Sequence, residues 1–199
     1  MAMCKTPQSN PISFSGRIIK RSFDITLSTI GLIFLFPLML LIWIAACIDT
    51  RQNGLFIQQR IGVSGSVFPL LKIRTMRTLS SWSTSVTTKN DPRITKFGRI
   101  LRGIKVDELP QLLNILVGHM SFVGPRPDVA GFVDQLSGAD RVILLLRPGI
   151  TGPATIRFRD EEITLGAQLD PERYNREIIW PEKVRLNRPL TFSQPCCDR

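Results

Sequence analysis

Hydrophobic positions gather in one long run near the start of the chain. Residues 25–48 form a stretch of 24 uncharged residues, 19 of them apolar, which is bounded by Asp24 and Asp49. At ~1.5 Å per residue, a helix of this length would extend about 36 Å, against a hydrocarbon core of ~30 Å. The pattern therefore predicts a membrane helix that begins near Ser15. A cleavable signal peptide is not expected, because no small-residue cleavage site follows the run.

Pro37 lies in the middle of this run and leaves two membrane arrangements open. A proline removes a backbone hydrogen bond from a helix and clashes with the preceding turn. Two half-length helices could enter and leave the same leaflet, which suits basic flanks at both ends because positive charge favours the cytoplasmic side. A kinked helix that spans the bilayer is the alternative. The flanking basic residues are Arg17, Lys20, Arg21, Arg51 and Arg60.

Shorter periodic segments follow the membrane run. Residues 55–59 and 67–73 predict two strands joined by a glycine-containing turn. Residues 79–91 are rich in Ser and Thr and predict a loop. From Ile94 onwards apolar residues recur at helical spacing, and a second helix is predicted at 109–116. Further helical patterns cover 129–136, 142–146 and 171–183.

The net charge of +10 is concentrated in one segment. Residues 51–105 contain eleven basic residues and one acidic residue, so this segment carries the whole excess. Such a segment favours nucleic acid, an acidic leaflet or a phosphorylated substrate as a partner. The predicted helix after Ile94 could lie on an anionic leaflet, or its basic face could simply be solvated. Nucleic acid is not expected, because no ladder of aromatic residues accompanies the charge.

The motifs absent from the chain narrow its chemistry. It contains no Walker loop, dinucleotide-binding glycine pattern, zinc-protease motif or serine-hydrolase elbow, and His119 is the only histidine. The remaining candidates are the carboxylates of Asp107 and Glu108, at the start of the helix predicted for 109–116. Cations near them in the sequence favour ionisation, and an ionised Asp can bind Mg²⁺ or attack phosphorus. Helix capping by the carboxylates and solvated surface charge for the cations are the structural alternatives. These cations are Lys72, Arg74, Arg102, Lys105 and Arg126.

Several motifs follow one another in a specific order between residues 17 and 183. They read KRSFD at 20–24, KIRTM at 72–76, DPRIT at 91–95, GR at 98–99, LR at 101–102, DELPQL at 107–112, MSFVGPRP at 120–127 and RPGITG at 147–152. Together they resemble the bacterial sugar transferase family, the monotopic phosphoglycosyl transferases. The resemblance departs from the family at two positions. Phe36 precedes Pro37 where the family often has Ser, and His119 stands where it usually has Asp.

The resemblance implies an activity at the cytoplasmic face of the bacterial inner membrane. A phosphosugar would pass from a UDP-sugar to a polyprenyl phosphate, usually undecaprenyl phosphate, with release of UMP, to begin glycan or exopolysaccharide assembly. Mg²⁺ dependence and a covalent phosphosugar intermediate on Asp107, which would also bind the metal, are implied as well. Glu108 is the partner of Asp107, and the implied phosphate-binding residues are Lys72, Arg74, Arg102, Arg126 and Arg147.

The expected fold is α/β, mostly helical with a short β-hairpin, and membrane-associated through an N-terminal re-entrant helix hairpin broken at Pro37. The expected domains are a tail at 1–14, the membrane hairpin at 15–50, a cytosolic catalytic domain at 51–185, and a divergent or truncated tail at 186–199. The expected partners are the UDP-sugar, the polyprenyl phosphate and the anionic inner leaflet, with a homo-oligomer also open. A membrane scaffold without catalysis is the rival, and it would not need Asp107.

Overall fold

The computed structural model describes residues 14–78, 91–188 and 190. The tail expected at 1–14, the loop expected at 79–91 and the tail expected at 186–199 therefore lie mostly outside the described residues. The described part is mostly helical and contains two small two-stranded sheets. The predicted helical fold with a β-hairpin is thus confirmed in its broad outline.

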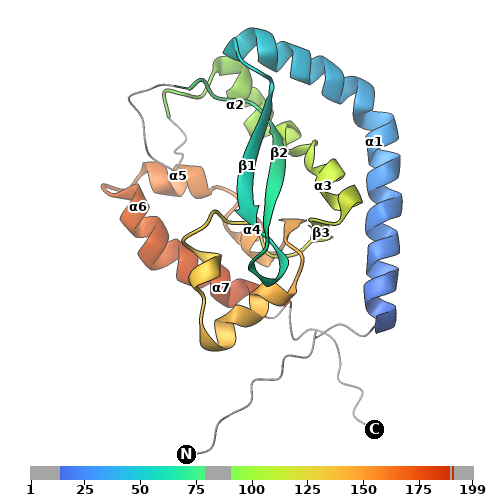
Figure 1. Cartoon of the computed structure of the whole chain (residues 1–199). Helices are drawn as coiled ribbons and strands as arrows, with labels where there is room; N and C mark the ends of the chain where they lie inside the picture. Colours follow the sequence, from blue (N-terminus) through green and yellow to red (C-terminus); the bar gives the residue numbers. More distant parts are fainter. Residues whose placement is uncertain (1–13, 79–90, 189, 191–199) are drawn as a thin grey trace, which may run out of the picture.

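The apolar run forms one continuous helix, α1 (Phe14–Thr50), with Pro37 inside it. Figure 1 shows α1 bent in its middle. A bend is the expected effect of a proline, because proline has no N–H group to donate to the helical backbone hydrogen bonds. The structure does not divide the run into two separate helices at Pro37, because helical geometry continues across the bend. Only 6% of its most apolar window is buried, so α1 is compatible with membrane association rather than with a soluble core.

The predicted hairpin is confirmed. Strand β1 (Leu55–Ile61) pairs antiparallel with β2 (Val67–Ile73), from Leu55 opposite Ile73 to Ile61 opposite Val67. β1 extends two residues beyond the predicted strand. The 3-10 turn η1 (Val63–Gly65) joins the strands, with Gly65 at a φ of +82°, a conformation that favours glycine.

Two helices and a second, smaller sheet follow the hairpin. Helix α2 (Lys96–Gly103) begins where the Thr95 hydroxyl accepts a hydrogen bond from the Gly98 amide at 2.8 Å. The 3-10 turn η2 (Val106–Glu108) and helix α3 (Gln111–Val117) come next. Strand β3 (Ser121–Val123) then pairs in parallel with β4 (Gly149–Thr151), a pairing that local patterns did not predict. The main core lies between β2, α3 and α1, and its buried residues are Phe68, Leu70, Leu112, Ile115 and Met120.

The chain after β3 forms mostly short helices, and those between residues 161 and 187 lie on the side of the hairpin away from α1 (Figure 1). The helix predicted at 129–136 is only the 3-10 turn η3 (Val133–Gln135), and the one predicted at 142–146 is the 3-10 helix η4 (Gly138–Leu145). Helices α4 (Pro153–Arg157) and α5 (Glu161–Gly166) were not predicted, because both are short. The helix predicted at 171–183 is confirmed as three consecutive elements. These are α6 (Pro171–Tyr174), the π-helical turn η5 (Asn175–Ile179) and α7 (Trp180–Asn187).

Polar side chains fasten the first half of α1 to the rest of the molecule. Arg21 donates hydrogen bonds to the carbonyl oxygens of Ile115 and Leu116 at 2.6 and 2.7 Å, which satisfies the end of α3 with a positive charge. Buried Asp24 accepts from the Ser121 hydroxyl at 3.2 Å and from the amide of Phe122 at 3.3 Å. The KRSFD motif therefore positions α1 against α3 and β3.

Candidate active site

Asp107 and Glu108 lie in η2, between α2 and α3, and both are buried. Lys105, at a φ of 60°, reverses the chain just before them. No side chain caps α3, whose N-cap is Pro110. The capping role considered for the two carboxylates is therefore wrong, because both lie before the first turn of α3. Their burial calls for another explanation.

Asn114 fixes this turn beside the hairpin. Its side-chain oxygen accepts a hydrogen bond from the Leu71 amide at 3.0 Å, and its side-chain nitrogen donates to the carbonyl oxygen of Pro69 at 2.7 Å. These two bonds link α3 to β2, the strand that carries Lys72. This link brings β2, with Lys72, next to Glu108.

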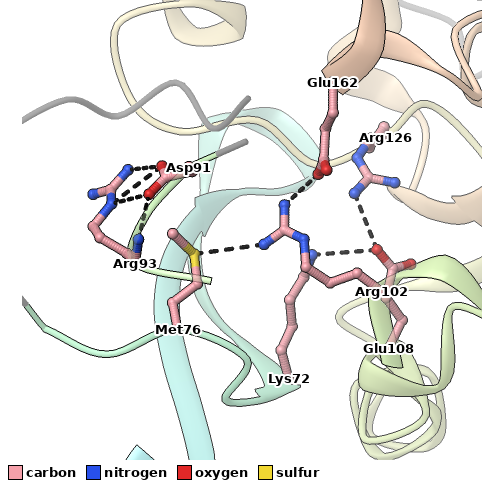
Figure 2. Close-up of polar contacts among 8 residues, drawn as sticks. All are labelled: Lys72, Met76, Asp91, Arg93, Arg102, Glu108, Arg126 and Glu162. Carbon is pink, nitrogen blue, oxygen red and sulfur yellow. Dashed lines mark hydrogen bonds and ion pairs between the residues drawn. The ribbon is translucent and has the colours of Figure 1, made fainter. Parts of the chain in front are cut away.

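Two cations converge on Glu108, as Figure 2 shows. Nζ of Lys72 lies 3.2 Å from Oε1 of Glu108, and Nη2 of Arg126 lies 3.0 Å from the same oxygen. Burial acts to raise the pKa of Glu108, but the charges of Arg126 and Lys72 outweigh it and lower the pKa from 4.5 to about 2. Glu108 is therefore ionised at neutral pH, as the sequence predicted.

Asp107 differs from its neighbour. Its Oδ1 atom is buried and has no hydrogen-bond partner among the residues that the structure describes. Burial raises the pKa of Asp107 above its usual 3.8, and Lys72 opposes this shift while Glu108 adds to it. Lys72, Arg102 and Lys105 act to lower the pKa of Asp107, in the direction that the sequence predicted, but burial outweighs them. The result is an uncompensated carboxylate oxygen beside a cluster of cations.

The other predicted basic residues occupy three different places. Arg102 forms an ion pair with Glu162 and points Nη1 at the sulfur of Met76, at 3.5 Å (Figure 2). Arg74 donates to the Asn53 carbonyl oxygen at 2.7 Å and stacks over the Phe56 ring at the edge of the cavity described below.

Arg147 is exposed and lines neither of the two cavities near the dyad. The part of its motif that packs is the backbone. A side chain at Gly124 would clash with the Arg147 carbonyl oxygen, so the two glycine-containing turns interlock through their main chains. The structure therefore does not bring Arg147 to the predicted phosphate site.

A polar cavity of about 480 Å³ surrounds the dyad. It contains Asp107 and Glu108 together with every predicted basic residue except Arg147. It also contains residues that sequence reasoning missed as site residues. These are Arg60, Asp128, Glu161 and Lys183.

The missed residues form their own contacts in the cavity wall. Lys183 lies 2.8 Å from both carboxylate oxygens of Glu161. Arg60 donates to the Gln58 side chain at 2.8 Å, while its Nε atom is buried without a partner among the described residues. Burial raises the pKa of Asp128, against the opposing charges of Lys183 and Arg60. For Arg60, β1 offered no local signal, because its residues form an apolar block followed by a polar block rather than an alternation.

An apolar cavity of about 760 Å³ adjoins the polar one. One wall is formed by Leu27, Gly31 and Leu35 of α1. Glu108 and Arg126 line both cavities, so the two spaces meet at the dyad. An apolar space walled by the long apolar helix α1 thus opens onto a cationic one.

The residues present fit a Mg²⁺ ion that binds together with a phosphorylated ligand. In the described part of the chain no group of three or more His, Cys, Asp or Glu side chains could hold a metal alone. Mg²⁺ is commonly bound through one or two carboxylates plus the oxygens of substrate phosphates. The free Oδ1 of Asp107, beside a cavity rich in cations, suits that kind of shared coordination.

Comparison with known proteins identifies the family of this chain. The family described as bacterial sugar transferases matches residues 15–186. The chain belongs to the bacterial sugar transferase family. The resemblance drawn from the motifs is therefore confirmed, and the match covers both α1 and the dyad.

Curated bacterial sugar transferases align with most of the chain. It is 38% identical over 172 residues to the undecaprenyl-phosphate galactose phosphotransferase of Salmonella typhimurium, across 77% of this chain and 36% of the relative. It is 37% identical over 187 residues to the UDP-glucose:undecaprenyl-phosphate glucose-1-phosphate transferase of Escherichia coli, across 92% of this chain and 40% of the relative. The chain therefore spans well under half the length of these two proteins.

A relative of more similar length is the exopolysaccharide production protein ExoY of Sinorhizobium fredii. It is 38% identical over 162 residues, which are 73% of this chain and 72% of the relative. In the present chain, the position of His119 also has a structural explanation. Its ring packs against Phe68, with centroids 5.5 Å apart, so the departure from Asp lies in the core-facing turn after α3.

Proposed function

We propose that the chain transfers a sugar phosphate from a UDP-sugar to undecaprenyl phosphate, with release of UMP, as an early step of exopolysaccharide or related glycan assembly. The observation that carries this proposal is the meeting of a cationic cavity and an apolar cavity at Glu108 and Arg126. A transferase with one water-soluble and one lipid substrate needs such a junction. The names of the relatives support the same pair of substrates.

The polar cavity suits the diphosphate of the donor. Arg60, Lys72, Arg102 and Arg126 all line it, and only part of their charge is balanced by Glu108 and Glu162. Fixed cations in a partly dry site stabilise phosphoryl charge more strongly than they would in water. The donor would therefore lie with its diphosphate among these side chains and its reacting phosphorus next to Asp107.

The apolar cavity suits the acceptor. Its α1 wall would let a polyprenyl chain enter from the leaflet, and its inner end reaches Arg126 and Lys105, which can hold the lipid phosphate. The chain and its phosphate would then approach the dyad from the side opposite to bulk water. The two substrates need not compete for one entrance.

In the proposed mechanism, an Asp107 oxygen attacks the sugar-proximal phosphorus of the donor, and the bond from that phosphorus to UMP breaks. An acyl phosphate forms on Asp107, and UMP leaves with the electron pair. An oxygen of the lipid phosphate then attacks the same phosphorus, which releases the carboxylate of Asp107 and forms the lipid-linked sugar diphosphate. Bound Mg²⁺, held by Asp107 and the donor phosphates, would supply neutralisation of the diphosphate charge. Glu108 holds Lys72 and Arg126 in position throughout.

The arrangement in the membrane is part of the proposal. Arg21 and Asp24, near the start of α1, contact α3 and β3, whereas Ala46, near its end, packs against Ile73 and Leu101. Both ends of α1 thus contact the same domain, which supports a re-entrant helix that bends at Pro37 and returns to the cytoplasmic face. A straight spanning helix would carry its two ends to opposite sides of the bilayer.

The covalent intermediate provides the test of this function. The purified full chain, incubated with a UDP-sugar and Mg²⁺ but without polyprenyl phosphate, should release UMP in a burst no larger than the enzyme concentration. Mass spectrometry should then find a phosphosugar on the peptide that contains Asp107. Asp107→Asn should show neither the burst nor the adduct.

Two outcomes would contradict the proposal in different ways. Full lipid-linked product from Asp107→Asn, with no adduct on the parent, would mean that the lipid attacks directly and that Asp107 only holds the metal. Absence of UMP release from every UDP-sugar tested, with and without lipid, would favour the membrane scaffold.

A further inference from the structure

The C-terminal helical stretch contains one wider turn, η5, between α6 and α7. The backbone amide of Trp180 donates to the carbonyl oxygen of Asn175, five residues earlier, rather than to the residue four earlier. Pro181 follows directly and has no backbone N–H, and in an α-helix its ring would clash with the carbonyl group of Glu177. The wider turn relieves that clash. Such turns inside helices are frequent at functional sites.

The wider turn changes which side chains share a face. In an α-helix, residues five apart differ by about 140° around the axis, since each residue turns ~100°. The i to i+5 bond of η5 instead brings Asn175 and Trp180 closer to the same face of the helix. Both residues line the polar cavity. The turn therefore places an amide and an indole on the same wall of the candidate active site.

This wall is held rigidly. Phe132 lines the same cavity and packs edge-to-face against Trp180, with ring centroids 5.4 Å apart and an interplanar angle of 70°. Trp180 also packs against the core cluster of Ile61, Val133 and Leu144. Aromatic rings fixed in this way offer a flat apolar surface at small entropic cost. They do not provide a phosphate site, because they carry no charge.

The polar groups beside the rings are acceptors as well as donors. The carboxylates of Asp128 and Glu161 line the cavity, and Lys183, three residues after Trp180, pairs with Glu161. A uracil ring presents two carbonyl acceptors and a single N–H donor, so it can satisfy at most one of these two carboxylates. The hydroxyl groups of a sugar donate to carboxylates and accept from amides, and the C–H face of the sugar packs on aromatic rings. The wall thus matches the transferred sugar better than the base.

We propose that Asn175, Trp180 and Phe132, with Asp128 beside them, form the subsite that holds the transferred sugar and selects among UDP-sugars. This inference rests on the proposed function, since it assigns one part of the donor to one part of the same cavity. The diphosphate lies among the cations near Asp107, and the sugar lies against the wall built by η5. A few placed polar groups in a pocket commonly decide specificity in this way.

The test compares the ranking of sugars with the binding of UMP. The full chain in membrane vesicles is assayed for UMP release with undecaprenyl phosphate and UDP-glucose, UDP-galactose, UDP-N-acetylglucosamine or UDP-N-acetylgalactosamine. In Asn175→Ala and Trp180→Phe, the ratio of kcat/KM between the two best sugars should change by about tenfold, the effect of roughly one lost hydrogen bond. Inhibition by UMP should stay within about twofold, because UMP lacks the transferred sugar.

Ile178→Ala is the matched control. Ile178 lies on the same turn, is 54% exposed and does not line the cavity, so its variant should keep the parent's ranking. An unchanged ranking in Asn175→Ala, or an equal loss for all UDP-sugars together with weaker UMP inhibition, would overturn the sugar subsite. Asn175→Ala decides the matter by itself if Trp180→Phe does not fold. A parent that releases no UMP from any of the four donors would instead overturn the proposed function.

Discussion

Asp107 and Glu108 are neighbours in the chain, yet their surroundings move their pKa values in opposite directions. Glu108 forms ion pairs with both Lys72 and Arg126, whereas Asp107 has a buried oxygen without a partner among the described residues. Lys72 is the largest influence that lowers the pKa of Asp107. This division suits a pair in which one carboxylate organises charge and the other reacts.

The pH dependence of the UMP burst should report this coupling. Asp107 must lose its proton to attack, so the burst rate should fall at acidic pH. Lys72→Met removes the charge that lowers the pKa of Asp107, and the acidic limb should therefore move to higher pH. Lys96→Met, an exposed position on α2, should leave the limb in place. An acidic limb at the same pH in Lys72→Met and the parent would show that Asp107 is not the titrating group.

Arg126 lines both cavities and is the strongest candidate for a direct phosphate contact. Arg126→Ala removes a charge-assisted contact worth about 1.5 to 3 kcal/mol, so turnover should fall at least tenfold while the protein remains folded. Arg173→Ala breaks only an exposed pair with Glu177 and should keep turnover within about twofold. Parent-like turnover in Arg126→Ala would mean that this side chain serves only to hold Glu108.

At the scale of elements, the sequence predicted those parts whose signals are local. The apolar run, the hairpin and the dyad before α3 follow from periodicity and contiguous motifs. Arg60 and Lys183 were missed because they reach the cavity only through packing of β1 and α7, residues far apart in the chain. Arg147 was predicted from its motif, yet the structure uses the backbone of that turn rather than the guanidinium.

The role of α1 as a wall of the apolar cavity can be tested separately from the chemical step on the donor. Leu27→Trp should fill part of that cavity, because Leu27 is 41% exposed and lines it. The UMP burst without lipid should stay at the parent's level, while transfer to undecaprenyl phosphate should slow by about tenfold with a raised KM. Phe34→Trp, at a position 77% exposed that lines neither cavity, is the control and should change neither half-reaction. Equal losses in both half-reactions of Leu27→Trp would contradict a separate lipid entrance.

At the scale of the whole molecule, α1 and the rest of the described chain form one structure. The start of α1 is fastened to α3 and β3, and its end is packed so closely that a side chain at Gly54 would clash with the carbonyl oxygen of Trp43. The chain leaves α1 and enters β1 within a few residues. A transmembrane arrangement would have to break one of these two attachments. In the proposed re-entrant arrangement, the bend in the middle of the helix would let both attachments persist in a single leaflet.

Site-directed labelling can decide the topology directly. The four native cysteines are first replaced by serine, and single cysteines are then introduced at Ser15 and Gln52, exposed residues at the two ends of α1. In intact cells, a reagent that cannot cross the inner membrane should label neither position, whereas inverted vesicles should expose both. A cysteine at Phe34 should resist the reagent from either side, because lipid would surround it. Periplasmic labelling at either end of α1 would establish a spanning helix, and the re-entrant arrangement would then be wrong even if the transferase activity were confirmed.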